Sequence, residues 1–386
     1  MDPNTQKKTV LLVDDAPSNI QTANSILKDI YKIRIATNGA KALELVKLLP
    51  YPDLILLDVM MPGMDGYEVC ARLKADPATR DIPVIFLTGQ TEIEDETRGF
   101  DVGAVDYIHK PFSPAVVKAR VQTHLVLRGI RQQLAQQLLA IQKELETARQ
   151  IQQSILPESV PQMEGLDIAA RYLPMTAVAG DFYDFIVLDS KHMGIMVADV
   201  SGHGMPAALI ASMLKIALAA QAENAAHPAR VLHGLNQALC GKFQQHFVTA
   251  AYAFFDMEER ILTYAGAGHP PLLLWSGSSA PVRDISENGL FLGRFDFATY
   301  SSVDVPLAPG DFGLLYTDGI PETTNAAQVE FGAERFRQFL VGERNISANQ
   351  LADRLLEELS RWSAHRQGED LEDDITMVAF HVSNNP

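Results

Sequence analysis

The chain has 386 residues, of which 47% are hydrophobic and 21% are charged, and its formal net charge is −16. The composition is that of ordinary folded domains, and the length predicts two of them. The negative charge argues against nucleic acid or an anionic membrane as the main partner, since both would repel it. The sequence has only two cysteines, no apolar run near the roughly 18 residues of a membrane span, and a polar N-terminus without a signal-peptide pattern, so we expect a cytoplasmic protein without disulfides.

The first third of the chain alternates short apolar runs with helical patterns. We expect strands at residues 10–13, 33–36, 54–57, 84–87 and 106–109, and helices that include residues 20–27 and 40–49. This alternation predicts a parallel sheet that is covered by helices on both faces.

Polar residues follow four of these strands. Asp14 and Asp15 follow the first strand, Asp58 the third, Thr88 the fourth and Lys110 the fifth. Doubly wound sheets place their ligands at the carboxyl ends of the strands. The acids would hold Mg²⁺, Thr88 and Lys110 would bind phosphoryl oxygens, and Asp58 would form an acyl phosphate. A solvated acid with a lysine partner would explain any one of these residues, but not all five in this order.

Residues 9–121 resemble the receiver domain of two-component response regulators, whose fold is a flavodoxin-like, five-stranded parallel sheet. The resemblance implies that Asp58 is the phosphoacceptor and that a sensor histidine kinase is the partner. It also implies that Asp14, Asp15, Asp58 and the main-chain carbonyl of Met60 surround Mg²⁺.

Two further features belong to this resemblance. Thr88 and Tyr107 match a switch pair in which the aromatic ring swings inward after phosphorylation. An exposed aromatic residue on a strand is the alternative interpretation of Tyr107, and it needs no switch. The Lys110-Pro111 peptide bond is usually cis in the family, which would aim the lysine at the site.

A long helix is predicted next, because residues 116–155 contain no proline and only one glycine, Gly129, and Pro157 would end the helix. Apolar residues recur at alternating steps of four and three, which predicts a parallel, two-stranded coiled coil and therefore a homodimer. A single amphipathic helix lying on the next domain is the alternative. The stripe consists of Leu127, Leu134, Leu138, Ile141, Leu145, Ala148 and Ile155, with the polar residues Arg131 and Gln152 on the same face.

The remainder of the chain is rich in predicted strands. They lie at residues 166–172, 182–188, 193–197, 249–256, 260–265, 272–275, 312–316 and 376–381, with helices at 206–222, 229–243 and 348–366. The pattern alone indicates an α/β or α+β domain.

Four acids, Asp181, Asp199, Asp318 and Asp373, stand at the edges of these strands. Hard divalent ions prefer oxygen ligands, so four converging carboxylates suit a site for two ions. Without cations, buried carboxylates would repel one another and become protonated. The neighbouring acids Asp184 and Asp374 are either structural caps or additional ligands.

Residues 145–382 resemble the metal-dependent serine/threonine phosphatases of the PPM (PP2C-like) class, in the bacterial branch of sporulation and stress-response phosphatases that control sigma factors. The resemblance rests on Ala179-Gly180-Asp181, on the segment 198–204 and on the sequences around Asp318 and Asp373. It implies two sheets between helices. It also implies two Mn²⁺ or Mg²⁺ ions, about 3.5–4 Å apart, that activate a water.

The implied ligands are Asp181, Asp199, Asp318 and Asp373, with the main-chain carbonyl of Val200 as a further one. A phosphorylated anti-sigma-factor antagonist is the implied substrate. The family's usual Gly-Gly-Asp begins with an alanine here, and eukaryotic relatives carry a histidine where this chain has Ser201, so we assign His203 no role in proton transfer.

Together these features predict a receiver domain at residues 1–121, a helical linker at 122–158 and a phosphatase domain at 159–386. Phosphorylation of Asp58 would control the phosphatase through the linker. The alternative is an inactive binding module that captures a sigma-factor regulator. The presence of all four acids argues against that alternative.

Overall fold

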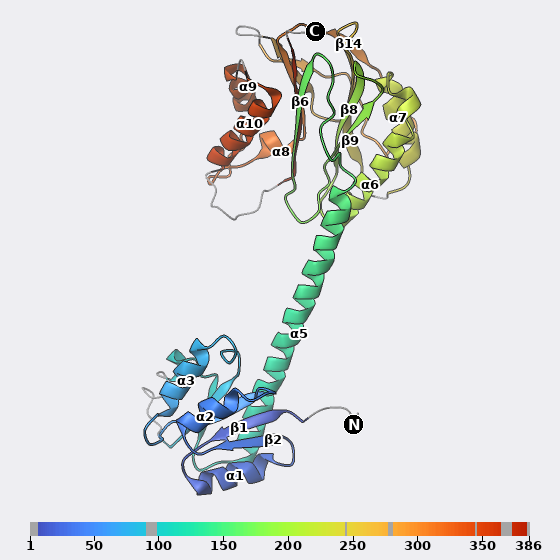
Figure 1. The fold of residues 1–386 in the computed structure, drawn as a ribbon. Coiled ribbons are helices and arrows are strands. Elements are labelled where there is room, and N and C mark those ends of the chain that lie inside the picture. The colour runs from blue at the N-terminus through green and yellow to red at the C-terminus, as the bar shows by residue number, and fades with distance from the viewer. Residues whose placement is uncertain are drawn as a thin grey trace. The chain divides into compact units, whose positions relative to one another are not determined.

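The computed structural model describes residues 7–89, 99–243, 245–276, 281–343, 346–363 and 373–383. The chain forms two compact units, residues 1–141 and 142–386 (Figure 1). None of the helices in the described ranges combines the length and hydropathy that a membrane span requires.

The first unit is built on a parallel sheet of five strands, in the order β2-β1-β3-β4-β5. All five predicted strands and the doubly wound fold class are confirmed. The strands are β1 (Thr9–Val13), β2 (Lys32–Ala36), β3 (Leu54–Asp58), β4 (Val84–Thr88) and β5 (Asp106–His109).

Helices cover both faces of this sheet, which is why β1, β3 and β4 are buried along their whole length. Alternate residues of β3 enter two separate cores. Ile55 and Leu57 pack in the layer of α2 and α3, and Leu54 and Leu56 in the layer of α1 and α5. The helices are α1 (Pro17–Leu27), α2 (Gly39–Val46), α3 (Gly66–Ala75) and α5 (Pro114–Gln153).

Helix α5 is 40 residues long and belongs to both units. It ends at Gln153, four residues before Pro157, which we expected to end it. The turn after it is tightened: Ile155 donates its N–H to the carbonyl of Gln152 at 3.1 Å, and Leu156 to that of Gln153 at 3.2 Å. The helix therefore ends before the residue whose backbone the proline restricts.

The predicted apolar stripe of α5 divides into two parts. Leu127, Leu134, Leu138 and Ile141 are each 50–54% exposed. Leu145 and Ala148 are half-buried, and Gln152 is only 6% exposed. The prediction that Gln152 lies on an open coiled-coil seam is wrong, because its side chain is buried against residues of the second unit.

The second unit contains two sheets packed face to face, as the resemblance implied. One has the order β13-β10-β9-β8-β7, with β14 also on β10, and the other has the order β12-β11-β15-β16-β6. The first consists of β7 (Phe182–Val187), β8 (His192–Val200), β9 (Val248–Asp256), β10 (Ile261–Ala267), β13 (Asn288–Gly289) and β14 (Val303–Pro306). The second consists of β6 (Leu166–Leu173), β11 (Leu272–Ser276), β12 (Arg283–Ile285), β15 (Asp311–Tyr316) and β16 (Ile375–Val382).

Residues between the two sheets form one core, exemplified by Ile195, Phe255, Leu274 and Phe380. Helices cover the outer faces (Figure 1). The first sheet is covered by α6 (Met205–Ala219) and α7 (Pro228–Leu239), and the second by α9 (Ala333–Gly342) and α10 (Ala348–Trp362), with the short α8 (Gly319–Glu322) after β15.

Sequence patterns missed the short strands β12, β13 and β14 and the helices α3, α8 and α9. They also placed the ends of α2, α6 and α7 too late in the chain. For α7, the reason is Gly241, whose φ of 74° is left-handed and ends the helical path two residues after Leu239. The predicted residues 364–366 of the last helix lie outside the described ranges.

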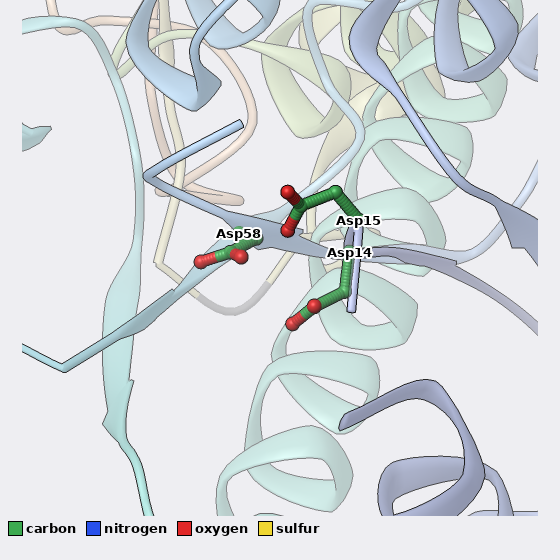
Figure 2. Close-up of side chains that lie close together, drawn as sticks. All are labelled: Asp14, Asp15 and Asp58. Carbon is green, nitrogen blue, oxygen red and sulfur yellow. The ribbon is translucent and has the colours of Figure 1, made fainter. Parts of the chain in front are cut away.

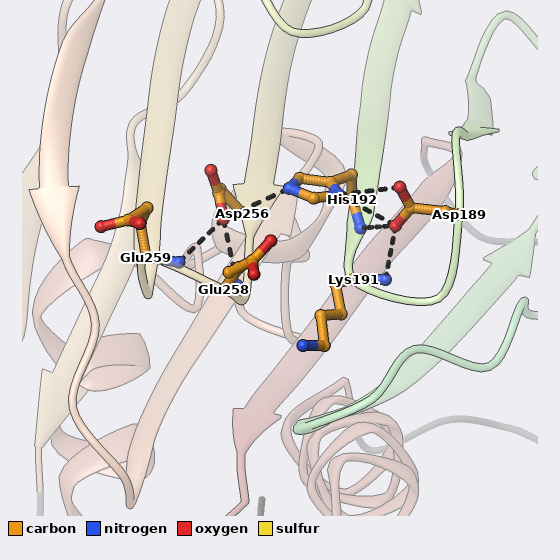
Figure 3. A network of polar contacts seen from close by, with 6 residues as sticks. All are labelled: Asp189, Lys191, His192, Asp256, Glu258 and Glu259. Atoms are coloured by element: carbon orange, nitrogen blue, oxygen red, sulfur yellow. Dashed lines mark hydrogen bonds and ion pairs between the residues drawn. The ribbon is translucent and has the colours of Figure 1, made fainter.

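A polar network joins two hairpin turns of the first sheet (Figure 3). The Nδ1 atom of His192 lies 2.9 Å from both carboxylate oxygens of Asp189, and its Nε2 lies 3.4 Å from Asp256. Asp256 also accepts backbone N–H groups of Glu258 and Glu259 at 3.0 and 2.9 Å. The hydrogen bond that His192 donates to the Asp189 carboxylate raises the pKa of His192.

Candidate functional sites

The acids of the first unit gather where β1 and β3 end. Figure 2 shows the carboxylates of Asp14, Asp15 and Asp58 close to one another. One oxygen from each lies within 4.8 Å of the others, and within the described ranges no other group of three acids, histidines or cysteines meets that spacing. Asp14 and Asp58 are buried, and Asp15 is exposed. The structure therefore brings the predicted Mg²⁺ ligands together.

Lys110 supplies a positive charge to this group. Its Nζ lies 2.9 Å from Asp14 Oδ2 and 2.9 Å from Asp58 Oδ1. Burial raises the pKa of Asp58, and the hydrogen bond from Lys110 opposes that shift. Burial by itself would lower the pKa of Lys110, but its bonds to the two acids outweigh burial and raise it. The Lys110-Pro111 bond is cis, as the resemblance implied.

Thr88 and Tyr107 come from the neighbouring strands β4 and β5. Thr88 is 6% exposed and directly follows Leu87, the strand partner of Asp58. Tyr107 is 4% exposed, and its ring lies 5.8 Å from that of Phe86. The interpretation of Tyr107 as an exposed strand aromatic is wrong. Its ring is buried in the core layer that also contains Phe86.

The four acids of the second unit come from neighbouring strands in each of the two sheets. Asp181 directly precedes β7 and Asp199 lies near the end of β8, two strands paired through Phe182 and Ala198. Asp318 follows β15 and Asp373 precedes β16, which pair through Tyr316 and Met377. Each sheet therefore contributes two acids.

The charges of these carboxylates influence one another. Burial raises the pKa of Asp181 well above its usual range, and the charge of Asp199 adds to that shift. Burial, followed by the charges of Asp318 and Asp373, raises the pKa of Asp199 to about 7. Burial also raises the pKa values of Asp318 and Asp373.

Within the described ranges, no lysine or arginine forms an ion pair with any of the four acids. Burial raises the pKa of Asp373, and the nearby His203 opposes that shift. No three of the four acids meet the 4.8 Å spacing of the receiver acids. Oxygen ligands that raise one another's pKa without a counter-ion from the protein suit hard divalent cations, so the donor set fits Mg²⁺ or Mn²⁺.

The two neighbouring acids have other tasks. Asp184 forms an ion pair with Lys215 at 2.8 Å. Asp374 accepts the backbone N–H groups of Met175 and Gly180, both at 2.7 Å. Of the alternatives that the sequence left open, the structure favours a structural cap for Asp374, whereas Asp184 serves in an ion pair.

Close packing shapes the segment before Asp181. A Cβ added to Gly180 would lie 2.8 Å from the carbonyl oxygen of Val200, so this position requires glycine. The φ of Ala179 is not positive, which explains why alanine replaces the family's glycine there. The Thr317 hydroxyl donates to Asp181 Oδ2 at 2.8 Å and orients the carboxylate.

Sequence reasoning missed Thr317 and three polar residues around the site. His246 Nδ1 lies 2.7 Å from the Ser201 carbonyl, and the Ser201 hydroxyl accepts the N–H of Phe247 at 2.9 Å. Gln152 contacts the backbone before Asp181. The position of Thr317 beside Asp318 was an available signal. The other contacts had none, because their partners lie far away in the sequence.

Comparisons with known proteins agree with both halves of the structure. Residues 189–383 match the family described as stage II sporulation protein E (SpoIIE), and residues 10–122 match the response regulator receiver domain. The chain belongs to the SpoIIE family and carries an N-terminal receiver domain. Three of the four acids, Asp199, Asp318 and Asp373, lie within the SpoIIE match.

Each of the individual relatives matches only one part of this chain. The chain is 38% identical over 202 residues to the phosphoserine phosphatase RsbU of Bacillus subtilis (strain 168), which is 52% of this chain and 58% of RsbU. It is 50% identical over 117 residues to a probable cyclic di-GMP phosphodiesterase of Vibrio cholerae, which is 30% of this chain and 26% of that protein. The chain thus spans between about a quarter and just over half of these relatives.

Among solved structures, the SiaA-PP2C domain of Pseudomonas aeruginosa is similar to the second unit. The TM-score is 0.56 at 26% identity, and the match covers 63% of this chain and 98% of that domain. This similarity agrees with the PP2C-like architecture.

Proposed function

We propose that this chain is a response regulator in which phosphorylation of Asp58 controls a metal-dependent protein serine/threonine phosphatase. The observation that carries the proposal is the mutual electrostatic influence of Asp181, Asp199, Asp318 and Asp373, which have no lysine or arginine partner in the described ranges. The receiver acids with Lys110 support the regulatory half.

In the receiver, Asp58 would accept a phosphoryl group from a phosphohistidine of a sensor histidine kinase. An oxygen of Asp58 attacks phosphorus, the phosphorus–nitrogen bond breaks, and the nitrogen keeps the electron pair. Lys110 already contacts Asp58 at 2.9 Å and would balance the added charge, and Thr88 would donate its hydroxyl to a phosphoryl oxygen. Asp14, Asp15, Asp58 and the Met60 carbonyl would hold the Mg²⁺ that this transfer requires.

In the phosphatase, Asp181, Asp199, Asp318, Asp373 and the Val200 carbonyl would hold two Mn²⁺ or Mg²⁺ ions. Bound ions of this kind neutralise phosphate charge and lower the pKa of a water. Thr317 and the tight packing of Gly180 keep Asp181 in place while the reaction adds water across the bond between phosphorus and the serine oxygen. That oxygen leaves with one proton of the water.

The proposed substrate is a phosphoserine protein, specifically a phosphorylated anti-sigma-factor antagonist. The similarity to RsbU, named a phosphoserine phosphatase, supports the phosphoserine part. The sigma-factor pathway rests on the resemblance to the bacterial branch of the family.

A homodimer through α5 is also part of the proposal. The exposed leucines and isoleucine of the stripe, Leu127, Leu134, Leu138 and Ile141, form its seam. The seam is confined to this part of the helix, because Leu145 and Ala148 are half-buried and Gln152 is buried.

Hydrolysis of a phosphoserine peptide and a generic phosphomonoester with Mn²⁺ tests the function. We expect Asp318→Ala to lower turnover at least about 10²-fold, because one ligand of the site is lost. Asp296→Ala, which removes an exposed acid, should leave turnover unchanged. A small phosphodonor with Mg²⁺ gives the sign of receiver control.

The outcomes separate an enzyme from a binding module. Turnover that is equal in wild type and Asp318→Ala would contradict the phosphatase proposal. Phosphodonor treatment that labels Asp58 without changing turnover would contradict receiver control. Binding of a phosphorylated antagonist without turnover, unaffected by Asp318→Ala, would favour the inactive binding module.

A further inference from the structure

A cavity of about 680 Å³ lies within the receiver unit, away from its acids. Two of the residues that line it, Pro83 and Val105, directly precede β4 and β5. Asp14 and Asp58 stand instead at the carboxyl ends of β1 and β3. The cavity is therefore at the opposite edge of the sheet, and its volume is within the roughly 300–1,000 Å³ of small-molecule sites.

Cationic side chains outnumber acids in the lining of this cavity. Four cations face one acid: they are Lys74, Arg80, Arg128 and Arg131, and the acid is Asp81. None of the four forms an ion pair with any carboxylate in the part of the chain that the structure describes. His124 also lines the cavity, but its Nε2 has a partner in Asp106 at 3.1 Å. The lining thus carries a surplus of three positive charges, in a chain whose net charge is −16.

Two of these cations are partly withdrawn from water. Arg128 donates from Nη1 to the carbonyl of Pro52 at 2.8 Å, while its Nε is buried and has no hydrogen-bond partner among the described residues. Lys74 donates from Nζ to two backbone carbonyls, both at 2.8 Å. Burial lowers the pKa of both groups, and for Lys74 the charges of Arg128 and Arg131 add to that shift. Half-buried cations without a counter-ion are costly, so an anion in the cavity would stabilise them.

The remaining lining indicates the class of that anion. Pro83, Val105, Leu127 and Ala135 are apolar, and they offer a surface that a bare inorganic ion would leave uncovered. Guanidinium groups match the geometry of phosphate oxygens and bind them in pairs. A surplus of three charges suits a diphosphate better than a single carboxylate. The lining therefore fits a molecule that has phosphate groups at one end and a planar, largely apolar ring at the other.

We propose that this cavity binds a nucleoside diphosphate or a phosphate-bearing ligand of the same class. Arg80, Arg128 and Arg131 would hold the phosphates, and the apolar residues would cover the ring. The site is separate from both acidic groups and does not depend on the proposed phosphatase reaction.

Titration calorimetry of ADP and GDP on the full chain tests the proposal. The buffer contains EDTA, so that neither acidic group holds a cation to which phosphate could bind. We expect saturable binding, which Arg131→Gln should weaken about tenfold or more, because a charge-assisted hydrogen bond is lost. Lys118→Gln is the matched control: it removes the same charge from another exposed position of α5 and should leave binding unchanged.

A variant that gains affinity guards against misfolding. Asp81→Asn removes the one acid of the lining, at an exposed position, and should tighten ADP binding severalfold, which a misfolded chain could not do. Pyrophosphate and adenosine, the two halves of the ligand, should each bind more weakly than ADP.

Three results would overturn the proposal. The first is a failure of both nucleotides to bind at millimolar concentration. The second is equal weakening by Arg131→Gln and Lys118→Gln, which would mean diffuse attraction to the surface. The third is equal affinity for pyrophosphate and ADP, which would leave a phosphate site without recognition of the ring.

Discussion

The two acidic groups of this protein differ in how they tolerate their own charge. In the receiver, Lys110 contacts Asp14 and Asp58, both at 2.9 Å, and three carboxylates lie within 4.8 Å of one another. In the phosphatase unit, the four acids have no lysine or arginine partner within the described ranges, and no three of them lie that close.

The two sites differ in the source of the positive charge that balances their carboxylates. The receiver contains a cation of its own, so its acids can be packed closely before Mg²⁺ or a phosphoryl group arrives. Burial together with mutual repulsion raises the pKa of Asp199 to about 7, so under the proposed function the acids of the second unit would depend on external cations.

Removal of Lys110 would leave both acidic groups without a lysine partner. Among the substitutions considered, it should cause the largest loss in the free energy of unfolding. Lys110→Ala leaves Asp14 and Asp58 without a counter-charge, and loss of one partner from a buried pair costs about 3–5 kcal/mol. We expect the lower end for the receiver, because the Lys110 side chain is 21% exposed. Mg²⁺ should recover part of the loss.

Urea unfolding of the full chain measures this effect. Both tryptophans, Trp275 and Trp362, lie in the second unit, so tryptophan fluorescence reports that unit alone and circular dichroism reports both. Only the dichroism transition of the receiver should shift in Lys110→Ala. Lys118→Ala, at an exposed position on α5, is the control. Equal stability of the two variants would show that the receiver acids do not need the lysine.

Gly180→Ala tests the second acidic group by disturbing the segment that precedes Asp181. The added Cβ would lie 2.8 Å from the Val200 carbonyl oxygen and 3.2 Å from that of Gly202, so the backbone must shift. We expect a loss of about 1–3 kcal/mol in the free energy of unfolding of the second unit, followed by tryptophan fluorescence, together with weaker Mn²⁺ binding.

The control is Gly342→Ala, where an added Cβ meets nothing within 4 Å. It should change neither quantity. Unchanged Mn²⁺ binding in Gly180→Ala would mean that the segment carrying Asp181 accommodates the displacement.

The smallest effect is expected at His192, where an imidazole balances acids at the surface of the second unit (Figure 3). Asp189 raises the pKa of His192 in the folded state. The stabilisation is therefore fully present below the ordinary histidine pKa of about 6.5, and it is lost as the pH rises through the higher folded value.

Thermal unfolding of His192→Gln measures that effect. The variant should melt about 1 °C below wild type at pH 6 and together with it at pH 9, because exposed ion pairs contribute little. The control is His227→Gln, which replaces a histidine at an exposed position. If the difference in melting temperature between wild type and His192→Gln grew as the pH rises, the pairing of His192 with Asp189 could not be its cause.

Local patterns in the sequence determined the five receiver strands, most strands of the second unit and the acids at the strand ends. This succeeded because apolar runs and the polar residues that follow them are neighbours in the chain. The same proximity explains why Asp14, Asp15, Asp58 and Lys110 could be assigned together: the ends of parallel strands meet at one edge of the sheet.

Only the tertiary structure decided which way particular side chains face. Gln152 fits a coiled-coil stripe by its spacing, yet its amide pairs with Ala179, 27 residues away. By sequence pattern, Asp374 is as good a candidate ligand as Asp373. In the structure it instead accepts the backbone N–H of Gly180, 194 residues away. Burial and hydrogen bonding with such distant partners leave no periodic trace in the sequence, because they depend on how the sheets and helices pack.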